Sequence, residues 1–344
     1  MSTVQRPRRA ALFAAIALLA LLGSSRLLEF HASAGPSPQP ANQSDSMAGS
    51  KPILCIANDE DAGFLAAARP LNSERCMIIY ESTFIDGGRI DENKLRRAVA
   101  DRIPEGWNGF ACLDIENEWF KNLARDPQSA EFRSGVDNLL RALRIARAVR
   151  PESKWSFYGI PNLPFFVKDA ENRTVGWDKV SPESKAQFIA VARQSQPIVD
   201  ACDWVAPTVY DPYFDATNPE WIEAQKARVR ESVQLAKEMG AVSGKPRPVL
   251  VFIWHRIHNS NKRDPLRLLG NQEFLEGQVL PALQAGAAGV VWWGADRYMI
   301  RSGELGKAQP AEAAALTKDA DATSAYLLRI NKEKLDALAP YFQR

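Results

Sequence analysis

Along residues 51–344, apolar and polar positions follow two patterns that take turns. Short apolar runs rich in β-branched and aromatic residues alternate with longer stretches whose apolar residues recur with the period of an α-helix. The short runs predict strands at Ile53–Ala57, Cys76–Glu81, Gly109–Ile115, Lys154–Gly159, Trp204–Tyr210, Pro248–Trp254 and Gly289–Trp293. The longer stretches predict helices at Asp91–Arg102, Ser129–Val149, Ser181–Val199, Pro219–Met239 and Asn271–Ala285.

This alternation predicts an α/β fold, a TIM-like (β/α) barrel that is distorted and has seven or eight parallel strands. An open sheet that binds a dinucleotide would carry a glycine-rich turn after its first strand. Here the first predicted strand is followed by the acidic segment Asn58-Asp59-Glu60-Asp61. We therefore expect no nucleotide cofactor, and an active site at the carboxyl ends of the barrel strands.

The first fifty residues differ from the rest. Three arginines precede the apolar run Ala10–Leu22, and Ala32-Ser33-Ala34 forms an A-x-A cleavage pattern. This predicts a signal peptide over 1–34, a flexible linker over 35–50 and one catalytic domain over 51–344. The apolar run is shorter than the ~20 residues of a membrane-spanning helix, so an uncleaved anchor is the alternative. We expect a secreted or periplasmic protein with no membrane contact beyond the export signal.

Charge excludes one class of partner. The chain has 43 Lys and Arg against 41 Asp and Glu, and 46 % hydrophobic residues, which is ordinary globular composition. Four of the basic residues and two of the acidic ones lie in residues 1–50, which leaves 39 of each in the domain. A nucleic-acid binder would need a basic stripe. The basic runs Lys94–Arg97 and Arg141–Arg150 have helical spacing and predict solvated helix faces; a track for an anionic polymer is the alternative.

The segment Gly109–Trp119 carries the strongest chemical signal, because its apolar strand runs directly into Asp114 and Glu116. Side chains alternate along a strand, so both carboxyls point to one face, which in a barrel is the mouth. Two carboxyls a few Å apart in a partly dry site do not both ionise readily, and one retains a proton near neutral pH. Such a pair suits proton donation to a glycosidic oxygen. The structural alternative is that the acids cap the next helix or pair with an arginine.

Aromatic side chains gather at the ends of three more predicted strands, at Tyr158, at Tyr210 with Tyr213, and at Trp293. Flat rings suit sugar rings, and Tyr and Trp can bury surface while keeping a hydrogen bond. Core packing would account for any single one of them. Their repetition at several strand ends favours a carbohydrate site.

Four segments together resemble the hyaluronidases of glycoside hydrolase family 56, which are (β/α) barrels. The family's third-strand motif G-L-A-x-I-D-W-E-x-W is similar to Gly109–Trp119. The family stretches W-x-F-Y-G-F-P, P-S-x-Y and G-A-A-G-V-V-x-W-G are similar to Trp155–Pro161, Pro207–Tyr210 and Gly286–Gly294. The order agrees, and the matches span most of residues 51–300.

The resemblance implies substrate-assisted, retaining hydrolysis of a polymer that contains N-acetylhexosamine. Glu116 would act as general acid and then base. Asp114 would hold and polarise the acetamido group, whose carbonyl oxygen attacks the anomeric carbon. Tyr210 matches a tyrosine that positions this group, Trp293 a tryptophan that lines the same pocket, and Tyr80 a tyrosine that contacts substrate. An internal nucleophile leaves the enzyme needing one proton donor and one orienting acid.

The chain also departs from the family pattern. Its D-I-E has Ile115 where the family has tryptophan, so one aromatic wall is absent or is supplied by Trp119. The residues after Cys202 include no cysteine, so they do not match the cysteine-rich module that follows the barrel in the family. On the strand Val249–Trp254 the family has tyrosines, and the register of that strand cannot be assigned from the sequence.

Histidine and cysteine offer little further chemistry. His255 and His258 have no carboxylate or cysteine at ligand spacing, so we expect them to form hydrogen bonds and expect no metal. Export permits disulfides, and Cys55 and Cys76 on neighbouring strands could bridge if their side chains face each other. The four cysteines are Cys55, Cys76, Cys112 and Cys202.

These observations predict an exported, hyaluronidase-like glycoside hydrolase with a polysaccharide substrate and no cofactor, metal or nucleic-acid partner. Its catalytic residues are predicted to be Glu116, Asp114 and Tyr210. Its substrate-binding residues are predicted to be Trp293, Tyr80, Tyr158, Trp119 and Tyr213. The alternatives are a barrel of the same ancestry that binds a glycan without cleaving it, and a glycosidase for a polymer without acetamido groups.

Overall fold

A computed structural model of the chain describes residues 51–57, 62–169, 171–213, 220–242, 244–316 and 320–344. The predicted signal peptide and linker, residues 1–50, lie outside the described residues. Residues 51–344 form one compact unit.

Six of the seven predicted strands form one parallel sheet with the order β6-β5-β2-β1-β10-β9. The sequence of β–α alternations therefore yields the expected mixed α/β fold with a curled parallel sheet. The strands are β1 (Ile53–Ala57), β2 (Ser73–Tyr80), β5 (Phe110–Asp114), β6 (Lys154–Phe157), β9 (Leu250–Ile253) and β10 (Gly289–Trp293).

The seventh predicted strand, Trp204–Tyr210, is not a continuous strand. Pro207 in its middle has no N–H to give to a ladder, and the segment makes only isolated bridges to its neighbours. It nevertheless hydrogen-bonds to both edges of the sheet. The bonds run from Val205 N to Pro248 O and Phe252 N to Pro207 O beside β9, and from Gly159 N to Ala206 O and Asp203 N to Trp155 O beside β6.

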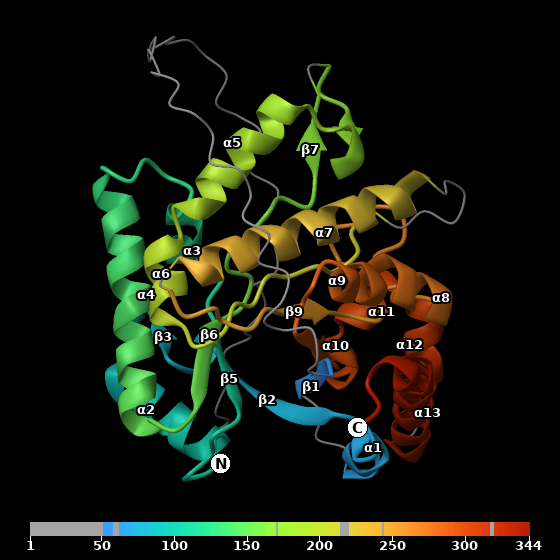
Figure 1. The fold of residues 1–344 in the computed structure, drawn as a ribbon. Helices are drawn as coiled ribbons and strands as arrows, with labels where there is room; N and C mark the ends of the chain where they lie inside the picture. Colours follow the sequence, from blue (N-terminus) through green and yellow to red (C-terminus); the bar gives the residue numbers. More distant parts are fainter. Residues whose placement is uncertain (1–50, 58–61, 170, 214–219, 243, 317–319) are drawn as a thin grey trace, which may run out of the picture. The chain divides into compact units, whose positions relative to one another are not determined.

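Helices occupy most of the remaining chain (Figure 1). Figure 1 shows α2 and α4 side by side, and α8 to α13 gathered in another part of the domain. The α-helices are α1 (Ala62–Ala68), α2 (Glu92–Arg102), α3 (Glu118–Asn122), α4 (Ala130–Val149), α5 (Pro182–Arg193), α6 (Gln196–Ala201), α7 (Glu220–Ala241), α8 (Asn271–Phe274), α9 (Leu280–Gln284), α10 (Asp296–Ser302), α11 (Glu304–Ala308), α12 (Pro310–Leu316) and α13 (Ala320–Leu338). Leu275–Val279 is a π-helical turn, and two small hairpins pair β3 (Ile85–Asp86) with β4 (Arg89–Ile90) and β7 (Val167–Lys168) with β8 (Thr174–Val175).

One predicted helix divides in two. The helix expected over Ser181–Val199 begins correctly, because Ser181 caps it by accepting from Ser184 N, with Pro182 in its first turn. The first part is α5, which ends at Arg193. The second part is α6, which begins at Gln196 and has Pro197 as its second residue. Proline lacks the N–H that would continue the hydrogen-bond ladder of α5, and this ends the first helix.

Alternate residues of the strands enter two different cores. One set, including Leu54, Met77 and Leu113, packs in the cluster that also holds helix residues such as Leu139 of α4. The other set, including Cys112 and Phe252, packs in a second cluster that includes several strand-end aromatics. A buried parallel sheet packs on both faces, so the period of two separates these sets.

The condition for a bridge between Cys55 and Cys76 is not met. Cys55, Cys76 and Cys112 are buried free thiols in the second cluster, and Cys202 is a buried free thiol in the first. In the β1–β2 register Cys76 stands opposite Ala57, two residues away from Cys55. Strand geometry separates such Cα atoms by about 8 Å, beyond the ~7 Å that a disulfide spans.

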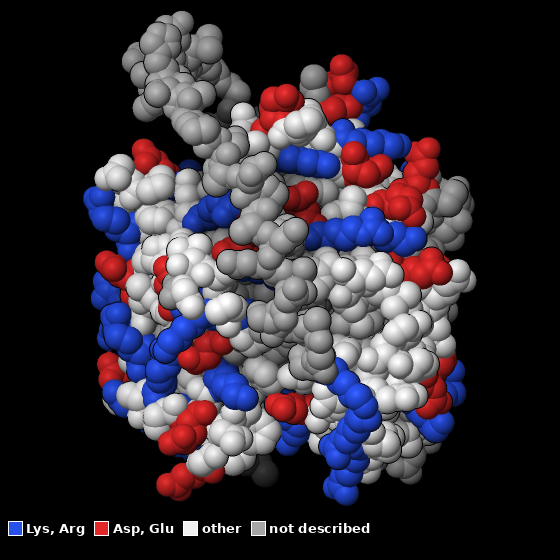
Figure 2. All heavy atoms as spheres, viewed as in Figure 1, with Lys and Arg blue, Asp and Glu red and all other residues white. Residues whose placement is uncertain are grey.

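The exposed charges are mixed. Figure 2 shows Lys and Arg interspersed with Asp and Glu over the face it presents. On α2, Arg96 pairs with Glu92 of the same helix, and Arg141 of α4 reaches the same carboxylate. This is the solvated helix face that the basic runs predict. Within the described residues, no helix combines the length and the apolar character that crossing a membrane requires.

Candidate active site

Asp114 and Glu116 lie together at the carboxyl end of β5. Asp114 is its last residue, and Asp114 and Glu116 are half-buried residues while Ile115 between them is fully buried. Burial raises the pKa of Glu116 to about 7, and the charge of Glu81 adds to the effect. Burial also raises the pKa of Asp114 well above its ordinary value, and the charges of Glu116 and Glu81 add to that shift. The pair therefore retains a proton towards neutral pH.

Glu81 is a third carboxylate of this site, and it was not singled out in the sequence. It follows Tyr80, the last residue of β2, and Tyr80 is the register partner of Asp114 on β5. Its Oε2 accepts a hydrogen bond of 3.2 Å from the backbone N of Glu116. Its place as the last residue of the predicted strand Cys76–Glu81 was the available signal, because carboxyl ends of parallel strands share one edge of a sheet.

Three tyrosines surround Asp114. Burial raises the pKa of Tyr80, Tyr158 and Tyr210, and in each case the negative charge of Asp114 raises the pKa further. The rings of Tyr158 and Tyr210 are 6.1 Å apart. The structure thus brings these predicted residues together from β2, from the turn after β6 and from the segment that bridges the sheet edges.

Trp293 completes this aromatic group at the end of β10. Its ring stacks on Tyr210 with centroids 5.7 Å apart, and its Nε1 donates a hydrogen bond of 3.1 Å to Tyr80 Oη. Trp254, which directly follows β9, meets Trp293 edge to face at 4.8 Å. Its Nε1 is buried and has no hydrogen-bond partner within the described part of the chain. Trp254 therefore lies on the same face as the site, as does Phe252 of β9, which meets Tyr158 edge to face at 5.0 Å.

Two predicted substrate-binding residues lie apart from this group. Trp119 on α3 is only 8 % exposed and packs in the helix-facing cluster, where its backbone oxygen closely approaches Gly135 of α4. Tyr213 is buried, stacks on Trp221 at 5.5 Å and meets Phe166 edge to face at 5.8 Å. The structure does not join either ring to the cluster formed by Tyr80, Tyr158 and Trp293.

The two histidines make hydrogen bonds, as expected. His258 packs on Tyr210 with ring centroids 6.0 Å apart and bonds to Ser260 Oγ at 2.7 Å. Burial lowers its pKa to about 3, and the positive charge of Arg228 contributes to this shift. His255 accepts from Trp292 Nε1 at 2.8 Å and lies 2.9 Å from Asp296 Oδ2. Among the described residues, no group of three His, Cys, Asp or Glu side chains is arranged to hold a metal ion.

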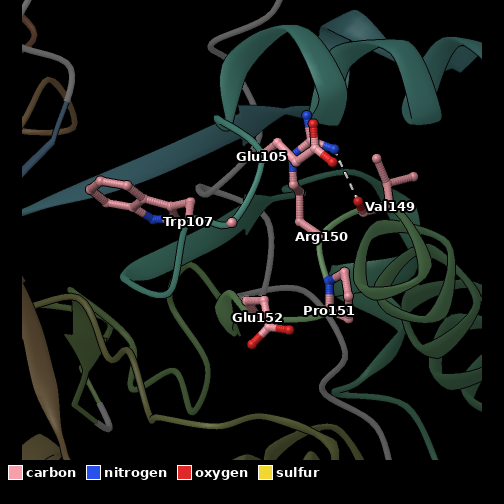
Figure 3. Close-up of a pocket in the computed structure, with 7 residues that line it drawn as sticks. Glu105, Trp107, Val149, Arg150, Pro151 and Glu152 are labelled. Atoms are coloured by element: carbon pink, nitrogen blue, oxygen red, sulfur yellow. Dashed lines mark hydrogen bonds between the residues drawn. The ribbon is translucent and has the colours of Figure 1, made fainter.

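A cavity of about 320 Å³ lies elsewhere (Figure 3). It is lined by the segments Glu105–Trp107 and Val149–Glu152, which lead into β5 and β6. Figure 3 shows Arg150 donating to Val149 O inside this group, a bond of 3.0 Å. Because Asp114 is at the other end of β5, this cavity belongs to the amino ends of the strands, where barrels do not carry their catalytic groups.

Comparison with known proteins shows similarity at the level of the fold. No family model and no curated protein sequence matches the chain. Bee venom hyaluronidase is similar to it in structure, with a TM-score of 0.53 and 14 % identity over 81 % of this chain and 99 % of that one. The same enzyme in complex with a hyaluronic acid tetramer gives 0.49 and 14 % identity over 76 % of this chain and 98 % of that one. The carboxyl transferase domain of Rhizobium etli pyruvate carboxylase reaches a TM-score of only 0.24 at 11 % identity, over 89 % and 55 % of the two chains.

The structure therefore defines a class: a mixed α/β fold with a curled parallel sheet like that of a hyaluronidase. At 14 % identity the similarity establishes the fold alone, and the activity has to be argued from the residues of the site.

Proposed function

We propose that this protein is a glycoside hydrolase that cleaves N-acetylhexosaminidic bonds of a polysaccharide by substrate-assisted, retaining catalysis. The observation that carries the proposal is the Asp114–Glu116 pair at the end of β5, in which burial raises both pKa values and which is bordered by aromatic rings. The hyaluronidase-like fold supports it, since the pair lies at the strand ends where such folds place their catalysts.

Glu116 is the proposed proton donor. In its acid form it protonates the glycosidic oxygen, while the substrate's acetamido carbonyl oxygen attacks the anomeric carbon and the bond to the leaving sugar breaks. A water molecule then attacks the anomeric carbon of the oxazolinium intermediate and gives its proton to Glu116, which restores the starting state. A carboxyl whose pKa is raised to about 7 is suited to both steps near neutral pH.

Asp114 is the proposed orienting acid. As a carboxylate it accepts the acetamido N–H and increases the electron density on the attacking carbonyl oxygen. Without substrate, burial disfavours its charge. A hydrogen bond from the acetamido N–H stabilises the charged form, so that substrate binding favours Asp114 as the ionised member of the pair and Glu116 as the acid. The substrate itself thereby sets the protonation state that its cleavage needs.

The aromatic group supplies the sugar-binding surface. Tyr210 is the proposed positioning residue for the acetamido group, and the adjoining ring of Trp293 packs against the sugar. Tyr80 and Tyr158 present hydroxyl groups near Asp114. With residues 1–34 as an export signal, the polymer is encountered outside the cytoplasm.

The experiment compares polymers that differ in the acetamido group. The full chain is incubated with hyaluronan, N-acetylated chitin oligomers and their N-deacetylated forms, and new reducing ends are counted. We expect cleavage of an N-acetylated polymer and at least a hundredfold loss of activity in Glu116→Gln, in a variant whose thermal stability is not reduced. Glu118→Gln is the matched control, because Glu118 is exposed and pairs with Lys121.

Two outcomes contradict the proposal in different ways. Binding of the glycan without release of reducing ends indicates a lectin-like barrel. Equal cleavage of acetylated and deacetylated polymers indicates a glycosidase with an enzyme nucleophile, since the acetamido group is then not needed.

A further inference from the structure

Glu81 has a place in the site but no part in the proposed reaction. It lies in the turn after β2, and β2 is hydrogen-bonded to β5 along its length. Its Oε2 accepts from the backbone N of Glu116 at 3.2 Å. Burial raises the pKa of Glu81, and hydrogen bonds from the backbone of Glu116 and Asn117 oppose that rise. The carboxylate is therefore held beside Glu116 by the same backbone that carries Glu116.

The charges that act on Glu116 come from carboxyl groups, Asp114 at the end of β5 and Glu81 in the turn after β2. Tyr158, in the turn after β6, interacts with Glu116 as a neutral hydroxyl, because burial raises its pKa. The cation that acts on Glu81 is Lys121 of α3. Its Nζ lies 2.6 Å from the exposed Glu118 carboxylate, so solvent and a second acid share its charge.

We propose that Glu81 is a positioning residue that keeps Glu116 in its acid form at neutral pH. It does so in two ways: its oxygen holds the backbone of Glu116, and its negative charge opposes ionisation of the neighbouring carboxyl. This inference rests on the proposed function, in which Glu116 must deliver a proton. A purely structural role would use the oxygen as an acceptor and leave the charge without effect.

Glu81→Gln separates these two roles, because glutamine keeps an acceptor oxygen and removes the charge. Glu81→Ala removes both, and Glu118→Gln removes an exposed charge nearby as the control. The first readout is the titration of the Glu116 carboxyl by ¹³C NMR on the full chain, with the resonance assigned by its absence in Glu116→Gln. We expect the midpoint to fall by about half a unit to one unit in Glu81→Gln and to stay in place in Glu118→Gln.

The second readout is the pH profile of kcat/KM on the polymer that the wild type cleaves. The general acid must be protonated, so the alkaline limb should move to lower pH in Glu81→Gln by the same amount. Activity would then fall several-fold above pH 7 and little below pH 5.5.

The outcomes are separable. An unchanged Glu116 midpoint in Glu81→Gln overturns the inference, whatever the activity. A wild-type midpoint below about 5 overturns it even if the variants do not fold, since Glu116 would then not be held in its acid form. A shifted midpoint in a protein that cleaves no N-acetylated glycan supports the electrostatic role of Glu81 and contradicts the proposed function alone.

Discussion

The indole Nε1 of Trp293 donates a hydrogen bond of 3.1 Å to the hydroxyl of Tyr80. The bond joins the end of β10 to the end of β2, across β1 that lies between them in the sheet. It ties two substrate-binding candidates into one surface, and the two residues are 213 positions apart in the chain.

This bond predicts a coupling between two substitutions. Trp293→Phe and Tyr80→Phe should each lower the free energy of unfolding by about 1 kcal/mol, and the double variant by less than their sum. Urea unfolding of the four proteins measures the difference. Trp254→Phe is the control, because its Nε1 has no described partner, and its effect should add to that of Tyr80→Phe. Additivity for the Trp293 pair would show that the bond is absent in solution.

The raised pKa values predict how stability depends on pH. The folded state holds the proton of Glu116 up to about pH 7, whereas the unfolded chain releases it near pH 4.5, so the folded state binds more protons between these values. Stability from this group is complete below pH 4.5 and is lost as pH rises through 7. Glu116→Gln, which cannot ionise, should therefore raise the melting temperature at pH 8 and change it little at pH 4. A variant that is equally or less stable than the wild type at pH 8 contradicts the shift.

A buried ion network predicts a large loss of stability. Arg256, which is fully buried, lies 2.7 Å from Asp296 Oδ1 and 2.7 Å from Glu312 Oε1, and it joins the end of β9 to α10 and α12. Asp296→Ala leaves a buried cation with one partner removed and should cost about 3 kcal/mol or more. Asp336→Ala, whose partner Lys332 is equally exposed, should cost less than about 0.5 kcal/mol. Similar losses in the two variants would mean that Arg256 is solvated.

Close strand contact predicts that Gly289 tolerates no side chain. A Cβ there would lie 2.1 Å from the backbone oxygen of Ile53 on β1. The backbone of a central strand cannot shift to relieve this clash without a large cost in free energy. Gly289→Ala should destabilise the protein by about 1–3 kcal/mol or prevent folding. At Gly294 the nearest atom is Ala57 O at 3.7 Å, so Gly294→Ala serves as the control in the same thermal unfolding assay. A stable Gly289→Ala variant would rule out the β1–β10 register.

Local patterns were sufficient for most of the elements. Alternating apolar runs located six strands, and the Ser181-Pro182 start marked the first residue of α5 correctly. These features depend on the properties of neighbouring residues, such as side-chain period, missing N–H groups and capping oxygens. Two predicted elements contain an interior proline and differ from the structure. The helix predicted across Pro197 is divided in two, and the strand predicted across Pro207 makes only isolated bridges.

The roles of single aromatic residues could not be read from spacing. Trp119 follows the D-x-E segment and was expected to contact substrate, yet it is buried in the helix-facing core, and its backbone oxygen lies close to Gly135 of α4. Trp254 was left unassigned and packs against Trp293 in the site. In both cases the face on which a ring lies depends on helix packing or strand register, which neighbouring residues do not specify.

The side-by-side placement of Asp114 and Glu116 follows from the sequence alone, because a strand presents every second side chain on one face. The approach of Glu81 to this pair follows only from the order of the sheet, in which β2 lies next to β5. So do the bond from Trp293 to Tyr80 and the separation of Cys55 from Cys76. Strand order and register result from the packing of the whole domain. This packing brings Glu81 next to Asp114 and Glu116, where the three carboxyl groups affect one another's pKa.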